Sequence, residues 1–172
     1  CEMKNQRQAS IKELNFPFEY RPGQKKLVSD VYRTIMRQKL LFMQAPTGVG
    51  KTISTIFPAV KAVGEELADR IFYLTAKTIT ATVAKETFAL LEKNGYRAKT
   101  IQITAKEKLC PCDEVECNPV TCPYAKGHFD RVNDAVFDLL HRCEMIERDD
   151  ILSQADRYTV CPFELCLDTA SW

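Results

Sequence analysis

The chain has 172 residues, 45% of them hydrophobic and 27% charged, as in a globular domain with an ordinary core. This composition excludes a disordered tail, a collagen-like fibre and a coiled coil. No apolar run approaches the ~20 residues of a membrane-spanning helix, and the polar first residues lack the apolar segment of a signal peptide. We therefore expect a cytoplasmic protein with no membrane partner.

The net charge of +1 conceals an uneven distribution. Residues 1–104 carry 17 Lys and Arg against nine Asp and Glu, whereas residues 105–172 carry seven against 14. Seven of the eight cysteines also lie in the acidic part, between Cys110 and Cys166. A basic first part favours a phosphate-rich partner, and the clustered cysteines call for a separate explanation.

The first part of the chain reads as a lead-in followed by alternating elements. Residues 1–15 are polar and predict a helical or frayed lead-in, and residues 16–24 form an aromatic loop punctuated by proline. The spacing of Leu27, Val31 and Ile35 predicts a helix over residues 24–38. The continuous apolar run at 40–43 predicts a strand buried on both faces of a parallel sheet.

The same alternation continues to residue 103. After a glycine loop, residues 51–63 predict a helix that Gly64 ends, and residues 71–74 predict a second strand. Residues 78–93 predict a helix closed by Asn94 and Gly95, and residues 98–103 a third strand. This order predicts an α/β fold with parallel strands and right-handed crossovers.

The pattern breaks after residue 103. Residues 110–122 are rich in proline and cysteine and contain no predicted strand. Apolar residues at helical spacing then predict two helices, one near 129–140 and one over 151–158. We expect a mainly α-helical, cysteine-rich insertion with its own small core.

A phosphate-binding loop lies between the first predicted strand and the next helix. The segment Ala45-Pro46-Thr47-Gly48-Val49-Gly50-Lys51-Thr52 has the residues and the flanking elements of a P-loop. Its glycines let backbone N–H groups approach a phosphate at the helix N-terminus. Lys51 would reach the β- and γ-phosphates, and the hydroxyl of Thr52 would bind Mg²⁺. A glycine turn without a ligand is the alternative.

A glutamine stands about twenty residues before this loop, in Arg21-Pro22-Gly23-Gln24. The amide of Gln24 can donate to and accept from an adenine edge, which makes it a candidate reader of the base. The aromatic residues Phe16, Phe18 and Tyr20 offer a stacking surface. The segment taken alone is better explained as an aromatic turn that anchors the core.

The cysteines have irregular spacing. Four of them follow the pattern Cys110-x6-Cys117-x4-Cys122-x38-Cys161, and the others in this part are Cys112, Cys143 and Cys166. Disulfides are disfavoured in the reducing cytosol. Structural zinc sites usually pair their ligands twice at short spacing, whereas an iron–sulfur cluster tolerates irregular spacing. Spacing therefore favours a cluster modestly over zinc, and unligated buried thiols are a further alternative.

Two of these cysteines belong to matching Cys-Pro-aromatic units, Cys122-Pro123-Tyr124 and Cys161-Pro162-Phe163. Proline is favourable at the first position of a helix. Each unit therefore predicts a helical stretch whose N-terminal dipole would lie beside an anionic cluster.

The combination resembles the XPD/DinG family of superfamily 2 iron–sulfur DNA helicases, with bacterial DinG-like members nearest. The resemblance extends from Phe16 to the end of the chain, in the family's order. The matching segments are 20–24, the P-loop, Tyr73-Leu74-Thr75-Ala76-Lys77-Thr78 and the cysteine run ending at Cys161-Pro162-Phe163-Glu164. It implies a lead-in at 1–15, part of a RecA-like motor domain with helices on both sheet faces at 16–104, an iron–sulfur domain at 105–166 and a return towards the motor domain at 167–172.

The resemblance also assigns roles to residues. Gln24 and Arg21 would lie at the adenine, and Thr75, Lys77 and Thr78 near a single-stranded DNA backbone. Ordinary capping and a solvated charge also explain Thr75 and Lys77. The implied ligands of a [4Fe–4S] cluster are Cys110, Cys117, Cys122 and Cys161. Cys112 is a rival to Cys110, and Cys166 a weaker rival to Cys161.

The implied activity is that of an ATP-dependent DNA helicase that moves 5′ to 3′ on single-stranded or forked DNA in repair or replication. The acidic Asp-Glu-x-His box of the family occurs nowhere in the chain. We therefore expect a part of a longer helicase, inactive by itself, whose partner is the second motor domain. DNA contacts near the cluster would be local, through Lys106, Lys108, Lys126 and Arg131. The alternatives are a P-loop ATPase with a structural zinc module, acting as a switch or scaffold, and a catalytically dead nucleic-acid binder.

Overall fold

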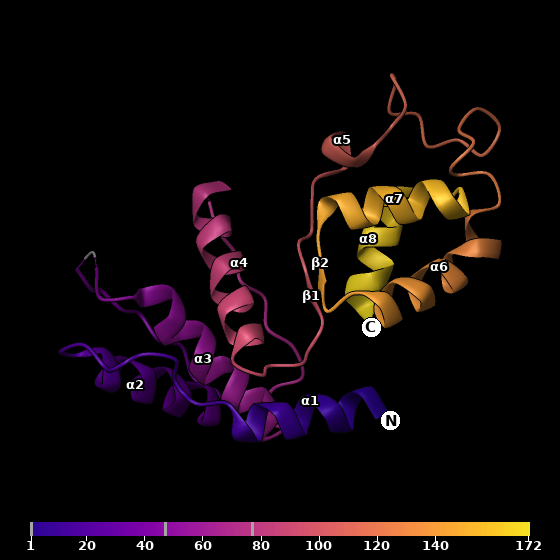
Figure 1. The fold of residues 1–172 in the computed structure, drawn as a ribbon. Coiled ribbons are helices and arrows are strands. Elements are labelled where there is room, and N and C mark those ends of the chain that lie inside the picture. The colour runs from indigo at the N-terminus through magenta and orange to yellow at the C-terminus, as the bar shows by residue number, and fades with distance from the viewer. Residues whose placement is uncertain (1, 47, 77) are drawn as a thin grey trace. The chain divides into compact units, whose positions relative to one another are not determined.

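The computed structural model describes residues 2–46, 48–76 and 78–172, with Thr78 described for its backbone alone. The chain divides into two compact units, which we call the first unit (Cys1–Ala98) and the second unit (Lys99–Trp172). The elements of both units appear in Figure 1. The first unit holds α1 (Glu2–Glu13), α2 (Gln24–Met36), α3 (Lys51–Gly64) and α4 (Thr78–Lys93). The second holds β1 (Thr100–Ile101), α5 (Lys106–Leu109), α6 (His128–Arg142), β2 (Met145–Ile146), α7 (Arg148–Tyr158) and α8 (Pro162–Ser171).

Helix α3 is the centre of the first unit, and α1, α2 and α4 all pack against it. Its buried side chains include Ile56 and Val60, which join Leu91 of α4 in one apolar core. Helix α1 approaches α3 so closely that a Cβ atom on Gly64 would lie 2.3 Å from Cγ2 of Ile11. The C-terminal turn of α1 is tied down as well, because Lys61 Nζ donates to the Ile11 carbonyl oxygen at 2.7 Å.

The helices of the first unit were predicted correctly. Helix α3 ends at Gly64 as expected, and α4 covers residues 78–93. Gly95 follows α4 with a φ of +99°, a left-handed conformation that glycine adopts without strain. The Tyr96 N–H donates to the Leu91 carbonyl oxygen at 3.0 Å, which satisfies one of the last carbonyls of the helix.

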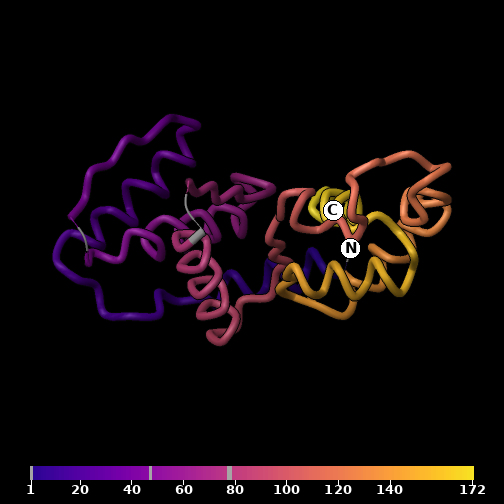
Figure 2. Tube along the Cα trace, turned by 90° about the horizontal axis from the view of Figure 1, so that it is seen from above, coloured from indigo at the N-terminus to yellow at the C-terminus, as the bar shows by residue number. Residues whose placement is uncertain are grey.

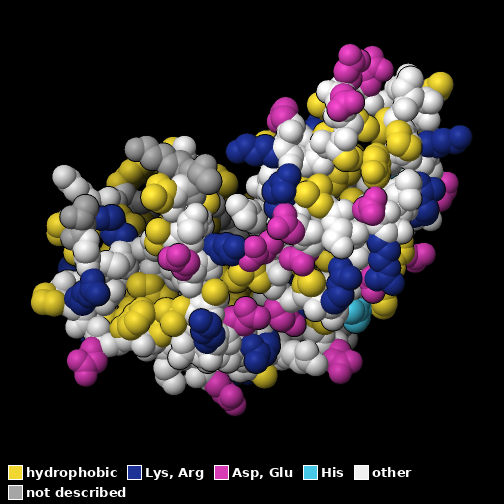
Figure 3. All heavy atoms as spheres, turned by 45° about the horizontal axis from the view of Figure 1, so that its top comes forward, with side chains coloured by type: hydrophobic (Ala, Val, Ile, Leu, Met, Phe, Trp, Pro, Cys, Tyr) yellow, Lys and Arg dark blue, Asp and Glu magenta, His cyan; other side chains and the backbone are white. Residues whose placement is uncertain are grey.

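The predicted parallel sheet of the motor domain was wrong for the described residues. Neither 40–43 nor 71–74 forms a strand, and Leu40, Phe42 and Leu74 are 86%, 91% and 87% exposed. On the face drawn in Figure 3, hydrophobic side chains lie open at the surface. An apolar run indicates a preference for burial. A strand also needs a hydrogen-bonded neighbouring strand, and a buried parallel sheet needs layers that cover both of its faces. The described chain is therefore mainly helical.

The only ladder among the described residues lies in the second unit. The third predicted strand, 98–103, is reduced to β1, which pairs in parallel with β2 through Thr100–Met145 and Ile101–Ile146. Helices α6, α7 and α8 surround a core that includes Leu139, Ile151 and Leu165. The mainly helical second part with its own core is thus confirmed.

A long irregular segment separates α5 from α6, and the tube in Figure 2 follows it. It contains Cys110, Cys112, Cys117 and Cys122. The predicted helical stretch after Cys122 is a turn in the structure, with one bond from the Lys126 N–H to the Cys122 carbonyl oxygen at 3.1 Å. Within the described ranges, no helix has both the length and the apolar character to cross a membrane.

Candidate functional site

The phosphate loop enters α3 through two glycines in the left-handed region. Gly48 has a φ of +85° and Gly50 a φ of +74°, and α3 begins at the next residue, Lys51. Side chains other than glycine rarely adopt this conformation. The loop therefore delivers Lys51 and Thr52 to the first turn of a 14-residue helix, whose free N–H groups favour an anion.

Lys51 folds back over its own loop. Its Nζ donates to the carbonyl oxygens of Ala45 at 3.0 Å and of Pro46 at 2.9 Å. These bonds hold the ammonium group beside the loop. Val49 lies within the loop, and Thr47 lies outside the described residues.

The two predicted adenine residues lie against this loop. Gln24 is only 3% exposed, and its Nε2 donates to the Val49 carbonyl oxygen at 3.0 Å. Its Oε1 accepts the Arg21 N–H at 3.1 Å, and the Arg21 guanidinium donates through Nη1 to the Gly48 carbonyl oxygen. The structure thus brings Arg21 and Gln24 together with the P-loop from about 25 residues away in the sequence.

The burial of Gln24 gives it a role that the sequence did not reveal. Both ends of its amide bond the backbone, so it braces the loop around Val49. Gly50 is part of the same contact, because a Cβ atom there would lie 2.8 Å from Gln24 Nε2. No pattern around Gln24 in the sequence indicates this role, because it depends on a contact with a loop about 25 residues away.

The aromatic segment before α2 divides its rings between core and surface. Phe16 packs edge-on against Phe57 of α3, with ring centroids 5.3 Å apart, and stacks on Tyr20 at 4.3 Å. Phe18 and Tyr20 are exposed. The anchoring turn and the open stacking surface, which the sequence presented as alternatives, are therefore both present.

The expected DNA-contact motif leads into α4. Thr75 is half-buried and precedes the helix, and Thr78 is its first residue. Lys77 lies outside the described residues. Thr75 and Thr78 therefore lie at or just before the N-terminus of α4, where threonine is also expected as a capping residue.

Five cysteines of the second unit line a cavity of about 300 Å³. All four predicted cluster ligands, Cys110, Cys117, Cys122 and Cys161, line it together with Cys112. Cys166 does not: it is buried elsewhere, with Sγ 3.9 Å from the Gln102 carbonyl oxygen. The lining of the cavity therefore favours Cys161 over Cys166 as a candidate ligand, but it does not distinguish Cys110 from Cys112.

The thiols stand around a space and do not converge on a point. Within the described part of the chain, no three His, Cys, Asp or Glu side chains are grouped closely enough to hold one metal ion. Soft thiolates select zinc, copper(I) or iron–sulfur clusters. The donor set fits that chemistry.

The environment of the thiols is partly apolar and partly cationic. Partial burial, with the neighbouring Cys122 and Cys110 thiols, raises the pKa of Cys112 to about 11. Burial also raises the pKa of Cys161, and the backbone N–H groups of Glu164 and Phe163 at the start of α8 oppose that rise. Lys106 supplies the positive charge, and a hydrogen bond to Cys117 raises its pKa.

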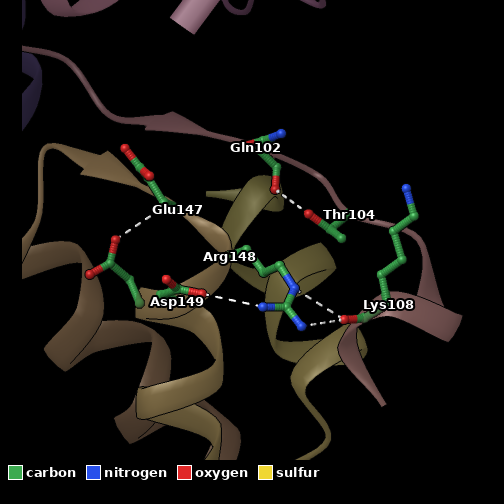
Figure 4. Close-up of polar contacts among 7 residues, drawn as sticks. Gln102, Thr104, Lys108, Glu147, Arg148 and Asp149 are labelled. Carbon is green, nitrogen blue, oxygen red and sulfur yellow. Dashed lines mark hydrogen bonds and ion pairs between the residues drawn. The ribbon is translucent and has the colours of Figure 1, made fainter. Parts of the chain in front are cut away.

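Two further residues that the sequence did not single out support the cavity. His128, the first residue of α6, lines it and accepts the Cys161 N–H on Nδ1 at 3.2 Å. Arg148, the first residue of α7, donates through Nε and Nη2 to the Lys108 carbonyl oxygen at 3.1 and 2.9 Å. Figure 4 shows this guanidinium pointing at the end of α5, two residues before Cys110. The two contacts hold opposite ends of the cysteine set.

Arg131, expected as a local DNA contact, is occupied within the second unit. Its Nη2 donates to the carbonyl oxygens of Lys126 at 2.7 Å and Thr159 at 2.6 Å, and its Nε donates to that of Tyr158 at 2.9 Å. It thus caps the C-terminal end of α7.

No family model, no curated protein and no solved structure matches the chain.

Proposed function

We propose that the chain is the ATP-binding and iron–sulfur part of an ATP-dependent DNA helicase of the XPD/DinG type. The observation that carries the proposal is the cavity of about 300 Å³ that Cys110, Cys117, Cys122 and Cys161 share. These four cysteines are spread over about 50 residues of the chain, and the fold of the second unit brings them to one cavity.

The size of the cavity favours a cluster over a single zinc ion. Zinc would draw four sulfurs to about 2.3 Å from one centre, whereas the thiols line a larger space. A [4Fe–4S] cluster takes one thiolate on each iron, and when bound it would cross-link the segment before α6 to the start of α8. The positive charge of Lys106 and the N-terminus of α8 would stabilise its negative charge.

The first unit would bind ATP and Mg²⁺ with its own residues. Lys51 would exchange the carbonyl oxygens of Ala45 and Pro46 for the β- and γ-phosphates, and Thr52 would bind Mg²⁺. The Lys51→Ala protein should lose ATP affinity by tenfold or more, because a charged hydrogen bond contributes about 1.5–3 kcal/mol. Lys25→Ala on exposed α2 is the control. Unchanged ATP affinity in Lys51→Ala would refute the nucleotide site.

The DNA partner would be single-stranded or forked DNA, with travel 5′ to 3′ in the longer protein. With Arg131 occupied and Lys106 bonded to Cys117, Lys108 and Lys126 are the local cations that would meet a DNA backbone in the second unit. Exposed Phe129 lines the cavity and would stack with a base.

The test of the proposal is metal and sulfide analysis of anaerobically purified protein. We expect about four irons and four acid-labile sulfides per chain and a visible absorbance that bleaches on reduction. A colourless protein with one zinc would instead support a P-loop ATPase with a structural zinc module.

A further inference from the structure

His128 is the one histidine of the cavity, and it is almost wholly enclosed. It is 4% exposed and opens α6 directly after Gly127, whose φ is +66°. The other histidine of the chain, His141, lies exposed near the opposite end of the same helix. Burial of an imidazole costs free energy unless its nitrogens are hydrogen-bonded.

The hydrogen bonds of His128 fix its orientation. Its Nδ1 accepts the Cys161 N–H at 3.2 Å, so the ring proton resides on Nε2. Nε2 is buried and has no hydrogen-bond partner, and the nearest carboxylate oxygen, Oδ2 of Asp168, is 3.6 Å away. The imidazole therefore lies between Cys161, the residue before α8, and Asp168, two turns further along that helix.

The bonded N–H belongs to the residue that carries a thiol of the cavity. Cys161 is the N-cap of α8 and has an extended backbone, with φ −61° and ψ 119°. Its N–H cannot bond within the helix. The bond to His128 fixes the backbone of Cys161 and with it the direction in which the thiol leaves the chain.

We propose that His128 is a positioning residue that holds Cys161 in place, so that it controls how firmly the cavity retains its metal group. The inference rests on the proposed cluster, but it concerns a residue that the helicase resemblance does not assign. Partners of metal ligands typically change metal affinity by 10–100-fold when they are lost. His128 acts here on the last ligand in the chain, the only one outside the segment between α5 and α6.

Two amide variants test the inference. In His128→Asn the amide oxygen lies where Nδ1 lies and can accept the Cys161 N–H, whereas in His128→Gln the amide lies further out, near the position of Nε2. Both keep a polar side chain in the site. His141→Gln is the matched control, because it changes the other histidine of α6 outside the cavity.

The measurements are iron and sulfide content after anaerobic purification, and the rate of iron release to a chelator. We expect His128→Gln to release iron about tenfold faster than wild type, and His128→Asn and His141→Gln to stay within about threefold. Equal release from His128→Gln and wild type would overturn the inference, and so would equal loss in both His128 variants. Circular dichroism of the metal-loaded proteins separates release from unfolding.

The wild-type protein distinguishes this inference from the proposed function. Wild type with zinc in place of iron contradicts the cluster but not the role of His128, which the same variants then test by zinc release. Wild type with iron and a His128→Gln protein of normal retention contradicts His128 alone. Wild type without any metal refutes both.

Discussion

The buried amide of Gln24 donates through Nε2 to the Val49 carbonyl oxygen at 3.0 Å, and this joins the start of α2 to the middle of the phosphate loop. Gln24 was singled out as a reader of adenine, and the contact adds a mechanical role to that expectation.

Gln24→Leu should weaken the binding of ATP and GTP by the same factor, about tenfold, since a lost buried hydrogen bond costs about 1–3 kcal/mol. Bracing acts on the phosphates, which both nucleotides share, whereas base reading would act on ATP alone. Nucleotide titration followed by calorimetry gives both affinities. Gln44→Ala, an exposed glutamine before the loop, is the control. A loss confined to ATP would contradict bracing and favour base reading.

Arg148→Lys should loosen the segment that leads to Cys110. Lysine keeps the charge but cannot deliver two N–H groups from a planar fork to the Lys108 carbonyl oxygen. We expect faster amide hydrogen exchange over residues 106–110 and a loss of about 1 kcal/mol in the free energy of unfolding of the second unit.

The control for that variant is Arg157→Lys, in the same helix, whose guanidinium contacts Asp138 at 2.8 Å and not α5. Exchange at 106–110 should match wild type in the control. If both variants exchange alike there, the clamp from Arg148 to α5 does not order the segment.

Gly64→Ala should destabilise the first unit, against the usual preference for alanine in helices. Helix propensity alone favours alanine by about 1 kcal/mol. The new Cβ would meet Ile11 Cγ2 at 2.3 Å, and overpacking of this kind costs about 1–3 kcal/mol. Urea unfolding measures the balance. The double variant Ile11→Ala/Gly64→Ala should show a favourable coupling, and additive effects would exclude the contact.

Burial raises the pKa of Tyr96 to about 12 from an ordinary value of 10.0. Above pH 10 the unfolded chain releases the phenolic proton while the folded chain keeps it, so stability falls as pH rises from 10 to about 12. The tyrosine accounts for a loss of about 2 kcal/mol over this window. Denaturant unfolding at several pH values should show a steeper decline in wild type than in Tyr96→Phe, and parallel declines would contradict the shift.

Helices could be predicted where short-range signals bound them. Gly64, Gly95 and the proline at the start of α8 act within one turn of chain, and the sequence displays them directly. The strands could not be predicted in the same way, because the apolar runs at 40–43 and 71–74 indicate a preference for burial but do not identify the neighbouring strand that a ladder requires. The ladder that forms instead pairs β1 with residues about 45 positions away in the sequence.

The candidate site shows the same division. The family resemblance implied Cys110, Cys117, Cys122 and Cys161 as ligands, and all four line one cavity, as does the rival Cys112. His128 and Arg148 act through carbonyl oxygens and N–H groups of other segments, and no pattern within their own helices reveals such contacts.

The parallel pairing of β1 with β2 sets an order for the assembly of the second unit. Closing a loop of about 45 residues costs conformational entropy, and only two paired residues on each strand and the core of α6, α7 and α8 offset that cost. Three of the four candidate ligands lie inside this loop, and Cys161 lies beyond it. Contacts between such distant segments form slowly, so we expect the pairing of β1 with β2 to be a late step in the folding of the second unit.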